Sequence, residues 1–91
     1  MLISITAGTV SKIADASGIN RRLVQNLTAV DVYVTTDPLA TNAVVLSDGV
    51  LLPASSNAAL VIDGISAGQA LYAAAASNAS LRVIDWGRVL P

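Results

Sequence analysis

The stretch RRLVQNLTAVDVYVTT (residues 21–36) contains two strand-like segments joined by a polar bend. In residues 22–27 polar and apolar side chains alternate, which places Arg22 and Asn26 on the same face of an extended chain. Residues 32–35 (VYVT) are rich in β-branched and aromatic residues, which are enriched in strands. The stretch therefore predicts a strand, a bend and a second strand, with two adjacent arginines at the entrance.

Similar short segments continue on both sides of this unit, and turn residues separate them. Asp48-Gly49 and Asp63-Gly64 are strong turn dipeptides, and the first of them predicts a hairpin between residues 43–46 and 50–52. Strands that recur every 8–12 residues are typical of a sandwich or a small barrel. The prediction is an all-β fold, a small antiparallel β-sandwich or jelly-roll-like barrel of about seven strands with an N-terminal arm. Eight candidate segments support this prediction of about seven strands, namely residues 2–6, 22–27, 32–35, 43–46, 50–52, 58–62, 70–75 and 81–86.

Two segments are ambiguous. Residues 9–17 have apolar side chains at helical spacing, yet they could equally form an irregular strand. Residues 69–76 are rich in Ala, which favours helix, but turn signals enclose the segment tightly and it is predicted as a strand. We assign residues 1–18 to an N-terminal arm or first strand and residues 19–91 to the β-sandwich domain.

The composition predicts a chain that associates. The 91 residues suit one domain, and 54% of them are hydrophobic while only 12% are charged, against a usual share of about 25%. A domain this small cannot hide that much apolar surface, so we expect a homo-oligomer or a subunit that docks on a larger assembly. No apolar run approaches the roughly 20 residues of a membrane span, and the start MLISITAG lacks the basic residues of an export signal. We therefore expect a soluble chain without a membrane partner.

Charge and residue types exclude several functions. The net charge is −1 and the isoelectric point is about 4.8, so nucleic acid and anionic membranes are not expected partners. The chain has no His and no Cys, and its only lysine is Lys12, which leaves a Ser–Lys dyad without a supporting motif. Asp63 and Asp85 are the plausible carboxylate pair, but both lie at strand ends, where Asp commonly serves a turn. We predict no catalytic residue, no cofactor and no metal site, and hence a protein that is not an enzyme.

The candidate functional residues are those suited to an interface. A guanidinium of Arg21 or Arg22 could fork onto a carboxylate or onto carbonyl groups at a subunit contact, or the two could simply mark a solvated strand entrance. Trp86 could close one end of the core or anchor an interface, because Trp and Arg are enriched at binding hot spots. The last residues are apolar for a chain end, which favours docking. The predicted interface residues are Arg21, Arg22, Trp86, Arg88 and Leu90.

Three segments together resemble small virion proteins of tailed bacteriophages. They are RRLVQNLTAVDVYVTTDPLAT (residues 21–41), SDGVLLPAS (47–55) and ALYAAAASNASLRVIDW (70–86), and the resemblance runs from Arg21 to Trp86. The sequence departs from the pattern where Ala54-Ser55 follows Pro53, a place at which Gly would be common.

The resemblance implies a β-sandwich that serves as virion architecture. Capsid decoration (cement) proteins of this kind often form trimers on the head shell and clamp neighbouring capsid subunits. The expected partners are further copies of the chain, as a homotrimer, and the major capsid protein or another virion protein. The expected location is the capsid surface of a virion whose parts are made in the host cytoplasm. The alternatives are a tail, fibre or head–tail joining protein, and a carbohydrate-binding β-sandwich module on a phage fibre.

Overall fold

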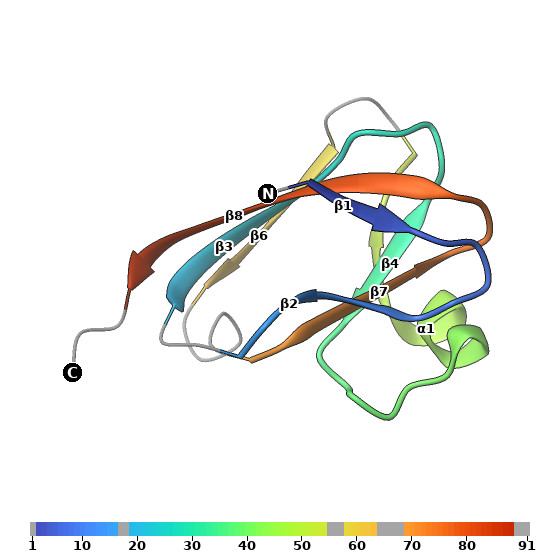
Figure 1. The fold of residues 1–91 in the computed structure, drawn as a ribbon, viewed down its shortest axis with the longest axis horizontal. Helices are drawn as coiled ribbons and strands as arrows, with labels where there is room; N and C mark the ends of the chain where they lie inside the picture. Colours follow the sequence, from blue (N-terminus) through green and yellow to red (C-terminus); the bar gives the residue numbers. More distant parts are fainter. Residues whose placement is uncertain (1, 17–18, 55–57, 64–68, 89–91) are drawn as a thin grey trace.

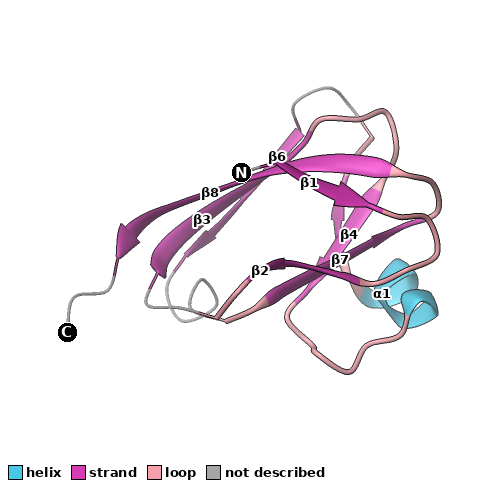
Figure 2. Ribbon diagram, viewed as in Figure 1, coloured by secondary structure: helices cyan, strands magenta, loops and turns pink. Residues whose placement is uncertain are grey.

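The computed structural model describes residues 2–16, 19–54, 58–63 and 69–88, and these form a sandwich of two antiparallel sheets (Figure 1). One short helix lies outside the sheets (Figure 2). The all-β prediction is confirmed, with eight strands among the described residues where the sequence predicted about seven. In chain order the elements are β1 (Leu2–Ile5), β2 (Ser11–Ala14), β3 (Ile19–Asn26), β4 (Val32–Thr35), α1 (Asn42–Asp48), β5 (Val50–Leu52), β6 (Ala58–Asp63), β7 (Leu71–Ala75) and β8 (Ala79–Arg88).

The strand order is that of a jelly roll. One sheet, called sheet A below, has the order β1-β8-β3-β6, and the other, sheet B, has the order β2-β7-β4-β5. The pairs β1·β8, β2·β7, β3·β6 and β4·β5 are all antiparallel neighbours, as in one long hairpin whose two arms are wound into a sandwich. The contacts β3·β8 and β4·β7 then join these pairs into the two sheets. Of the two predicted architectures, the sandwich with jelly-roll connections is therefore the observed one.

The hydrophobic core lies between the sheets. Strand alternation sends every second side chain inward, and Ala73 and Ala75 of β7 are small members of the buried cluster. Burying each Val, Leu or Ile side chain stabilises the fold by roughly 1.5–3 kcal/mol. The buried cluster consists of Ile5, Ile13, Ala14, Val24, Val32, Val34, Leu52, Leu71, Ala73, Ala75, Ala79, Leu81 and Val83.

The predicted strand at residues 43–46 is wrong, because this segment belongs to helix α1. Thr41 caps the helix by accepting a hydrogen bond from the backbone N–H of Val44 at 3.4 Å. Val45 is the buried residue of the helix, which packs on β4 and β7 over the outward-facing and fully buried Ala74. A run of four apolar residues is compatible with either a buried strand or part of a helix. Here the Thr41 cap and the packing against β4 and β7 favour the helix.

The predicted Asp48-Gly49 hairpin turn is also wrong, because Gly49 ends the helix instead. Its backbone N–H donates to the carbonyl of Val45 at 2.9 Å, and its φ of −67° is open to any residue. The need for Gly is a matter of space: a Cβ atom at this position would lie 2.6 Å from the Val45 carbonyl oxygen and 3.1 Å from the Tyr33 Cβ. Gly49 thus allows α1 to close onto sheet B.

The two ambiguous segments are both strands. Residues 11–14 form β2, and residues 71–75 form β7 as predicted. The segment 1–18, which the sequence left as an arm or a first strand, supplies β1 to the edge of sheet A and β2 to the edge of sheet B. The predicted bend after β3 is present, but it carries the chain from sheet A to sheet B and does not close a hairpin.

Candidate functional site

The strand register brings four of the five predicted interface residues to one end of sheet A. Arg21 lies opposite Trp86, and Arg88 lies opposite Ile19, on the neighbouring strands β3 and β8. Arg22 is the next residue of β3. Leu90 lies outside the described residues, and the side chains of Trp86 and Arg88 are likewise outside the described part. In Figure 1 this end of β8 extends furthest from α1.

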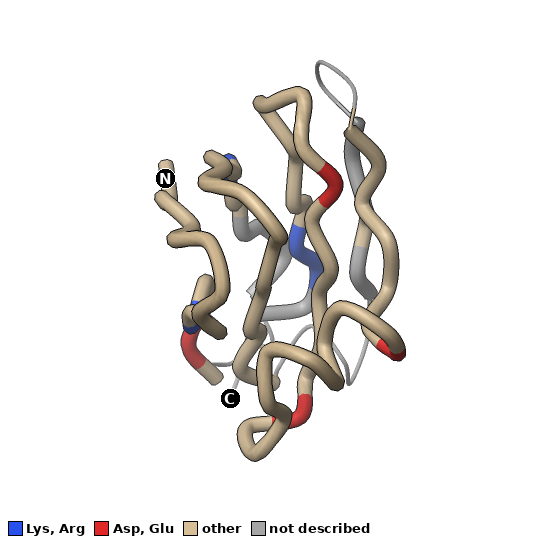
Figure 3. The backbone as a smooth tube through the Cα atoms, turned by 90° about the vertical axis from the view of Figure 1, so that its right-hand side faces the viewer, with Lys and Arg blue, Asp and Glu red and all other residues tan. Residues whose placement is uncertain are grey.

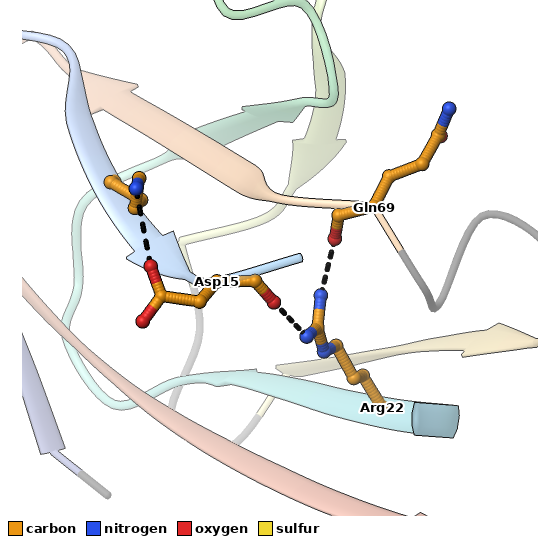
Figure 4. Close-up of polar contacts among 4 residues, drawn as sticks. Asp15, Arg22 and Gln69 are labelled. Carbon is orange, nitrogen blue, oxygen red and sulfur yellow. Dashed lines mark hydrogen bonds and ion pairs between the residues drawn. The ribbon is translucent and has the colours of Figure 1, made fainter. Parts of the chain in front are cut away.

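Arg22 points into the sandwich and not toward solvent. Its side chain is only 1% exposed, at an inward-facing position of β3. The guanidinium donates from Nη1 to the carbonyl of Gln69 and from Nη2 to the carbonyl of Asp15 (Figure 4). Gln69 precedes β7 and Asp15 follows β2, so one side chain of sheet A holds both neighbouring strand ends of sheet B.

The forked guanidinium that the sequence predicted is present, but its acceptors belong to the same chain. A planar fork suits two carbonyl groups that converge from neighbouring strands. The prediction of a subunit contact does not fit Arg22 in this structure, because a side chain this deeply buried offers no surface to another subunit. Arg21, the adjacent residue, is exposed on the opposite face of β3.

Asn26 is the counterpart of Arg22 at the other end of β3. It is fully buried, and its Nδ2 lies 2.8 Å from the Val30 carbonyl, 3.2 Å from that of Leu52 and 3.1 Å from that of Pro53. Its Oδ1 accepts from the backbone N–H and the hydroxyl of Thr28, both at 3.0 Å. Asn26 therefore fixes the bend between the sheets and the end of β5.

The sequence contained a signal for this pair. Arg22, Val24 and Asn26 alternate on one face of β3, so burial of Val24 implies burial of both polar neighbours. The roles of Arg22 and Asn26 depend on carbonyl groups that are distant in sequence, and these cannot be located without the fold.

The outer face of sheet A carries an apolar row that the sequence analysis missed. Ile84, Leu23 and Val61 lie side by side on β8, β3 and β6. Ile84 is 43% exposed and Val61 is 52% exposed, while Leu23 between them is half-buried. Leu2 of β1 is 67% exposed on the same face, but it lies opposite Arg82 and is therefore diagonal to Ile84 and not in line with the row. On the side of the row away from Arg82, the next pair on the same face is Arg21 and Trp86.

Arg82 borders this row. It is exposed on β8, and its Nη1 donates to Oε1 of Gln25 on the neighbouring strand at 3.4 Å. The register places Gln25 opposite Arg82, so the contact joins β3 and β8 on the outer face. The outer face of sheet A thus combines apolar side chains with exposed positive charge.

Two of the described acidic side chains accept hydrogen bonds from backbone N–H groups. Asp31 accepts from the Ala54 N–H at 2.5 Å, and Asp37 accepts from the Leu39 N–H at 2.9 Å. Figure 3 shows the acidic positions spread over separate segments and not gathered in one cluster. Within the described residues, no group of three or more metal-binding side chains occurs. Asp63 lies opposite Arg21 and Asp85 opposite Arg22 in register, and their side chains are outside the described part.

Lys12 and Asp15 form an exposed ion pair of 3.1 Å near the Arg22 contact. The hydrogen bond and the charge of Asp15 raise the pKa of Lys12 above its usual value of 10.5. A raised lysine pKa means that the pair favours the folded state throughout the neutral range. This contribution is lost only as the pH rises through the raised pKa.

A pocket of about 270 Å³ lies between β1, the bend after β3 and the turn before β8. Its floor is apolar and its rim is formed by hydroxyl and amide groups without charge. One rim residue is already engaged, since Oδ1 of Asn78 accepts from the Ala7 N–H at 2.9 Å. The lining residues are Ser4, Ile5, Thr6, Thr28, Asn78, Ala79 and Ser80.

Among the described residues, no helix has the length and apolar character to cross a membrane. No protein-family model, no curated protein and no solved structure matches this chain.

Proposed function

We propose that the chain is a non-enzymatic structural subunit of a tailed-phage virion, acting as a capsid decoration (cement) protein that self-associates and stabilises the head shell. The apolar row on the outer face of sheet A carries the proposal. Three exposed apolar side chains and the half-buried Leu23 gather on one face of four neighbouring strands, and grouped apolar side chains mark contact sites more often than isolated ones do.

The fold supports the proposal by analogy. Jelly rolls serve as capsid domains and as lectin domains, so the strand order agrees with a virion role without specifying one. The sequence resemblance to small virion proteins is a second, independent support. In this proposal, burial of apolar surface between copies and against the shell provides the affinity, and many equivalent contacts act together.

Electron microscopy of phage particles from the source tests the location. Gold-labelled antibodies against the chain are expected to decorate the head shell, and particles that lack the chain should lose their contents at a lower temperature. Labelling of the tail would contradict the decoration role and favour a tail, fibre or joining protein. Particles without any label would contradict a virion role altogether.

The pocket at β1 favours one alternative, a carbohydrate-binding module. Uncharged hydroxyl and amide groups such as Ser4, Thr6 and Asn78 match the donors and acceptors of a neutral sugar. Binding on a glycan array that disappears in Ser4→Ala, with unchanged melting, would support this function. An array without signal would leave the structural role as the better account.

A further inference from the structure

The two outer surfaces of the sandwich differ in charge but share exposed apolar side chains. The sheet A face, defined here as Leu2, Leu23, Val61, Ile84 and Arg82, combines the apolar row with a positive charge. Arg21 is also exposed on this face, where the strand register places it opposite Asp63, so Arg82 supplies the charge used below. A partner for this face needs apolar groups that are accompanied by negative charge.

The opposite side of the molecule has that character. Helix α1 packs on the outer face of sheet B, on the side away from sheet A (Figure 2). Val44 and Asp48 are four residues apart on α1 and both are exposed, so they lie one above the other on the solvent side of the helix. Leu39, in the turn before α1, is 87% exposed, and Asp37 stands beside it in the chain. We call Leu39, Val44, Asp37 and Asp48 the helix face.

Pairing of two identical sheet A faces gives Arg82 no described opposite charge. Both sides of a two-fold pair present the same surface, and the described side chains of the sheet A face include no acid. Complementary charges across an interface favour the pairing in which they meet. Pairing of the sheet A face with the helix face instead joins apolar groups to apolar groups and Arg82 to Asp48.

We propose that the sheet A face of one copy binds the helix face of the next copy, in a head-to-tail contact. The partner that covers the exposed apolar row is thus a second copy of this chain, which contacts the row through its helix face. Because the two faces lie on opposite sides of one sandwich, each added copy leaves one free face of each kind. Such a contact closes into a ring if the rotation between copies permits and otherwise propagates as a stack.

This inference rests on the self-association in the proposed function. It adds the head-to-tail direction of the contact and the residues that form it. The two can fail separately. Gold label on the head shell combined with a monomeric wild-type chain would overturn the head-to-tail contact alone. Head-to-tail assembly of a chain that labels no part of a virion would overturn the proposed function alone.

Two variants, each with one face blocked, provide the first test. Ile84→Asp places a charge in the apolar row and leaves the helix face intact. Val44→Asp places a charge on the helix face and leaves the sheet A face intact. Each variant is expected to raise the dissociation constant for self-association by about tenfold or more. Ala76→Asp, at an exposed position in the turn between β7 and β8, is the matched control and should assemble like the wild type. Circular dichroism melting checks that all three variants fold.

An equimolar mixture of the two blocked variants gives the decisive measurement. In a head-to-tail contact, the free helix face of Ile84→Asp binds the free sheet A face of Val44→Asp, so light scattering should show a 1:1 dimer that grows no further. Monomers in the mixture would overturn the proposal. Loss of assembly in Ile84→Asp alone, with Val44→Asp unaffected, would show that like faces pair and would also overturn it.

A charge exchange tests the partner of Arg82. Arg82→Asp and Asp48→Arg should each weaken self-association, and the double variant should recover most of the loss because the opposite charges are restored. Additive losses in the double variant would overturn the assigned pair. The wild-type association should also weaken as salt rises from low to physiological concentration, since exposed charges are screened over about 8–10 Å.

Discussion

Arg22 and Asn26 lie four residues apart on the inner face of β3, and each holds sheet A to backbone carbonyls at one end of sheet B. A buried polar side chain is tolerated when its donors are satisfied, and the loss of such a side chain leaves its acceptors without partners. The two residues therefore join the two sheets through hydrogen bonds at the two ends of an otherwise apolar interior.

Arg22→Ala should destabilise the fold more than it affects association. Removing the guanidinium leaves the carbonyls of Asp15 and Gln69 without this donor, and we expect a loss of about 2–5 kcal/mol in the free energy of unfolding. The placement of Arg22 at an interface, as predicted from the sequence, would instead imply a larger effect on assembly than on folding. Urea denaturation of Arg22→Ala, with the exposed Arg82→Ala as control, measures the difference. Equal stabilities of the two variants would show that the buried fork contributes nothing.

Asn26→Asp should make stability depend on pH. The substituted carboxylate keeps the shape of Asn26 but has no N–H to offer the carbonyls of Val30, Leu52 and Pro53. Burial and these oxygen neighbours raise the pKa of the new carboxyl group above its usual value of about 3.9, so its neutral form is favoured in the fold. A raised carboxyl pKa means that the variant gains stability relative to the wild type as the pH falls from 7 toward 4. Melting temperatures of both proteins at several pH values in this range test the sign, and parallel curves would contradict it.

At the scale of elements, α1 shows why part of the fold could not be predicted. Residues 43–46 (AVVL) are all apolar, so their hydrophobic pattern has no periodicity that could distinguish a short strand from part of a seven-residue helix. An isolated helix of this length is unstable in water, so its formation depends on docking against β4 and β7. The strands of residues 32–35 and 50–52 were predicted with their observed bounds, because β-branched residues and turn signals act locally.

Gly49→Ala should loosen the docking of α1. The added Cβ would meet the Val45 carbonyl at 2.6 Å, so the helix end or β5 must shift, at a cost of about 1–3 kcal/mol. Gly8→Ala is the contrasting variant, because its Cβ has open space and its cost arises from a φ of +76°. Hydrogen exchange should show faster exchange in α1 for Gly49→Ala only. Unchanged exchange of the Val45 and Gly49 amides would contradict the steric argument.

At the scale of the whole molecule, the described apolar side chains lie partly in the core and partly on the two outer faces. The composition predicts more apolar surface than a monomer could hide, and the exposed Leu2, Leu39 and Val61 are part of it. Their places on common faces cannot be predicted from the sequence, because Leu2, Val61 and Ile84 are brought together only by the pairing of β1, β8, β3 and β6. The sequence likewise does not separate the exposed Arg21 from the buried Arg22, and both were predicted at an interface.

The melting temperature should rise with protein concentration if these faces are occupied by further copies. Association consumes free native monomer, so by mass action it shifts the unfolding equilibrium toward the folded protein. Calorimetry over a hundredfold range of concentration measures the effect in the wild type, and Ile84→Asp should abolish the dependence. A melting temperature independent of concentration would count against association of the folded chain.

The nested pairing of the strands also predicts an order of folding. The pair β4·β5 encloses only residues 36–49, whereas β3·β6, β2·β7 and β1·β8 enclose successively longer stretches of chain. Closure of a short loop costs less entropy, and each inner pair shortens the loop that the next pair must close. The chain should therefore fold from its middle toward its ends. Conservative substitutions at Val34 or Leu52 are expected to slow refolding, while those at Ile5 or Leu81 should mainly accelerate unfolding.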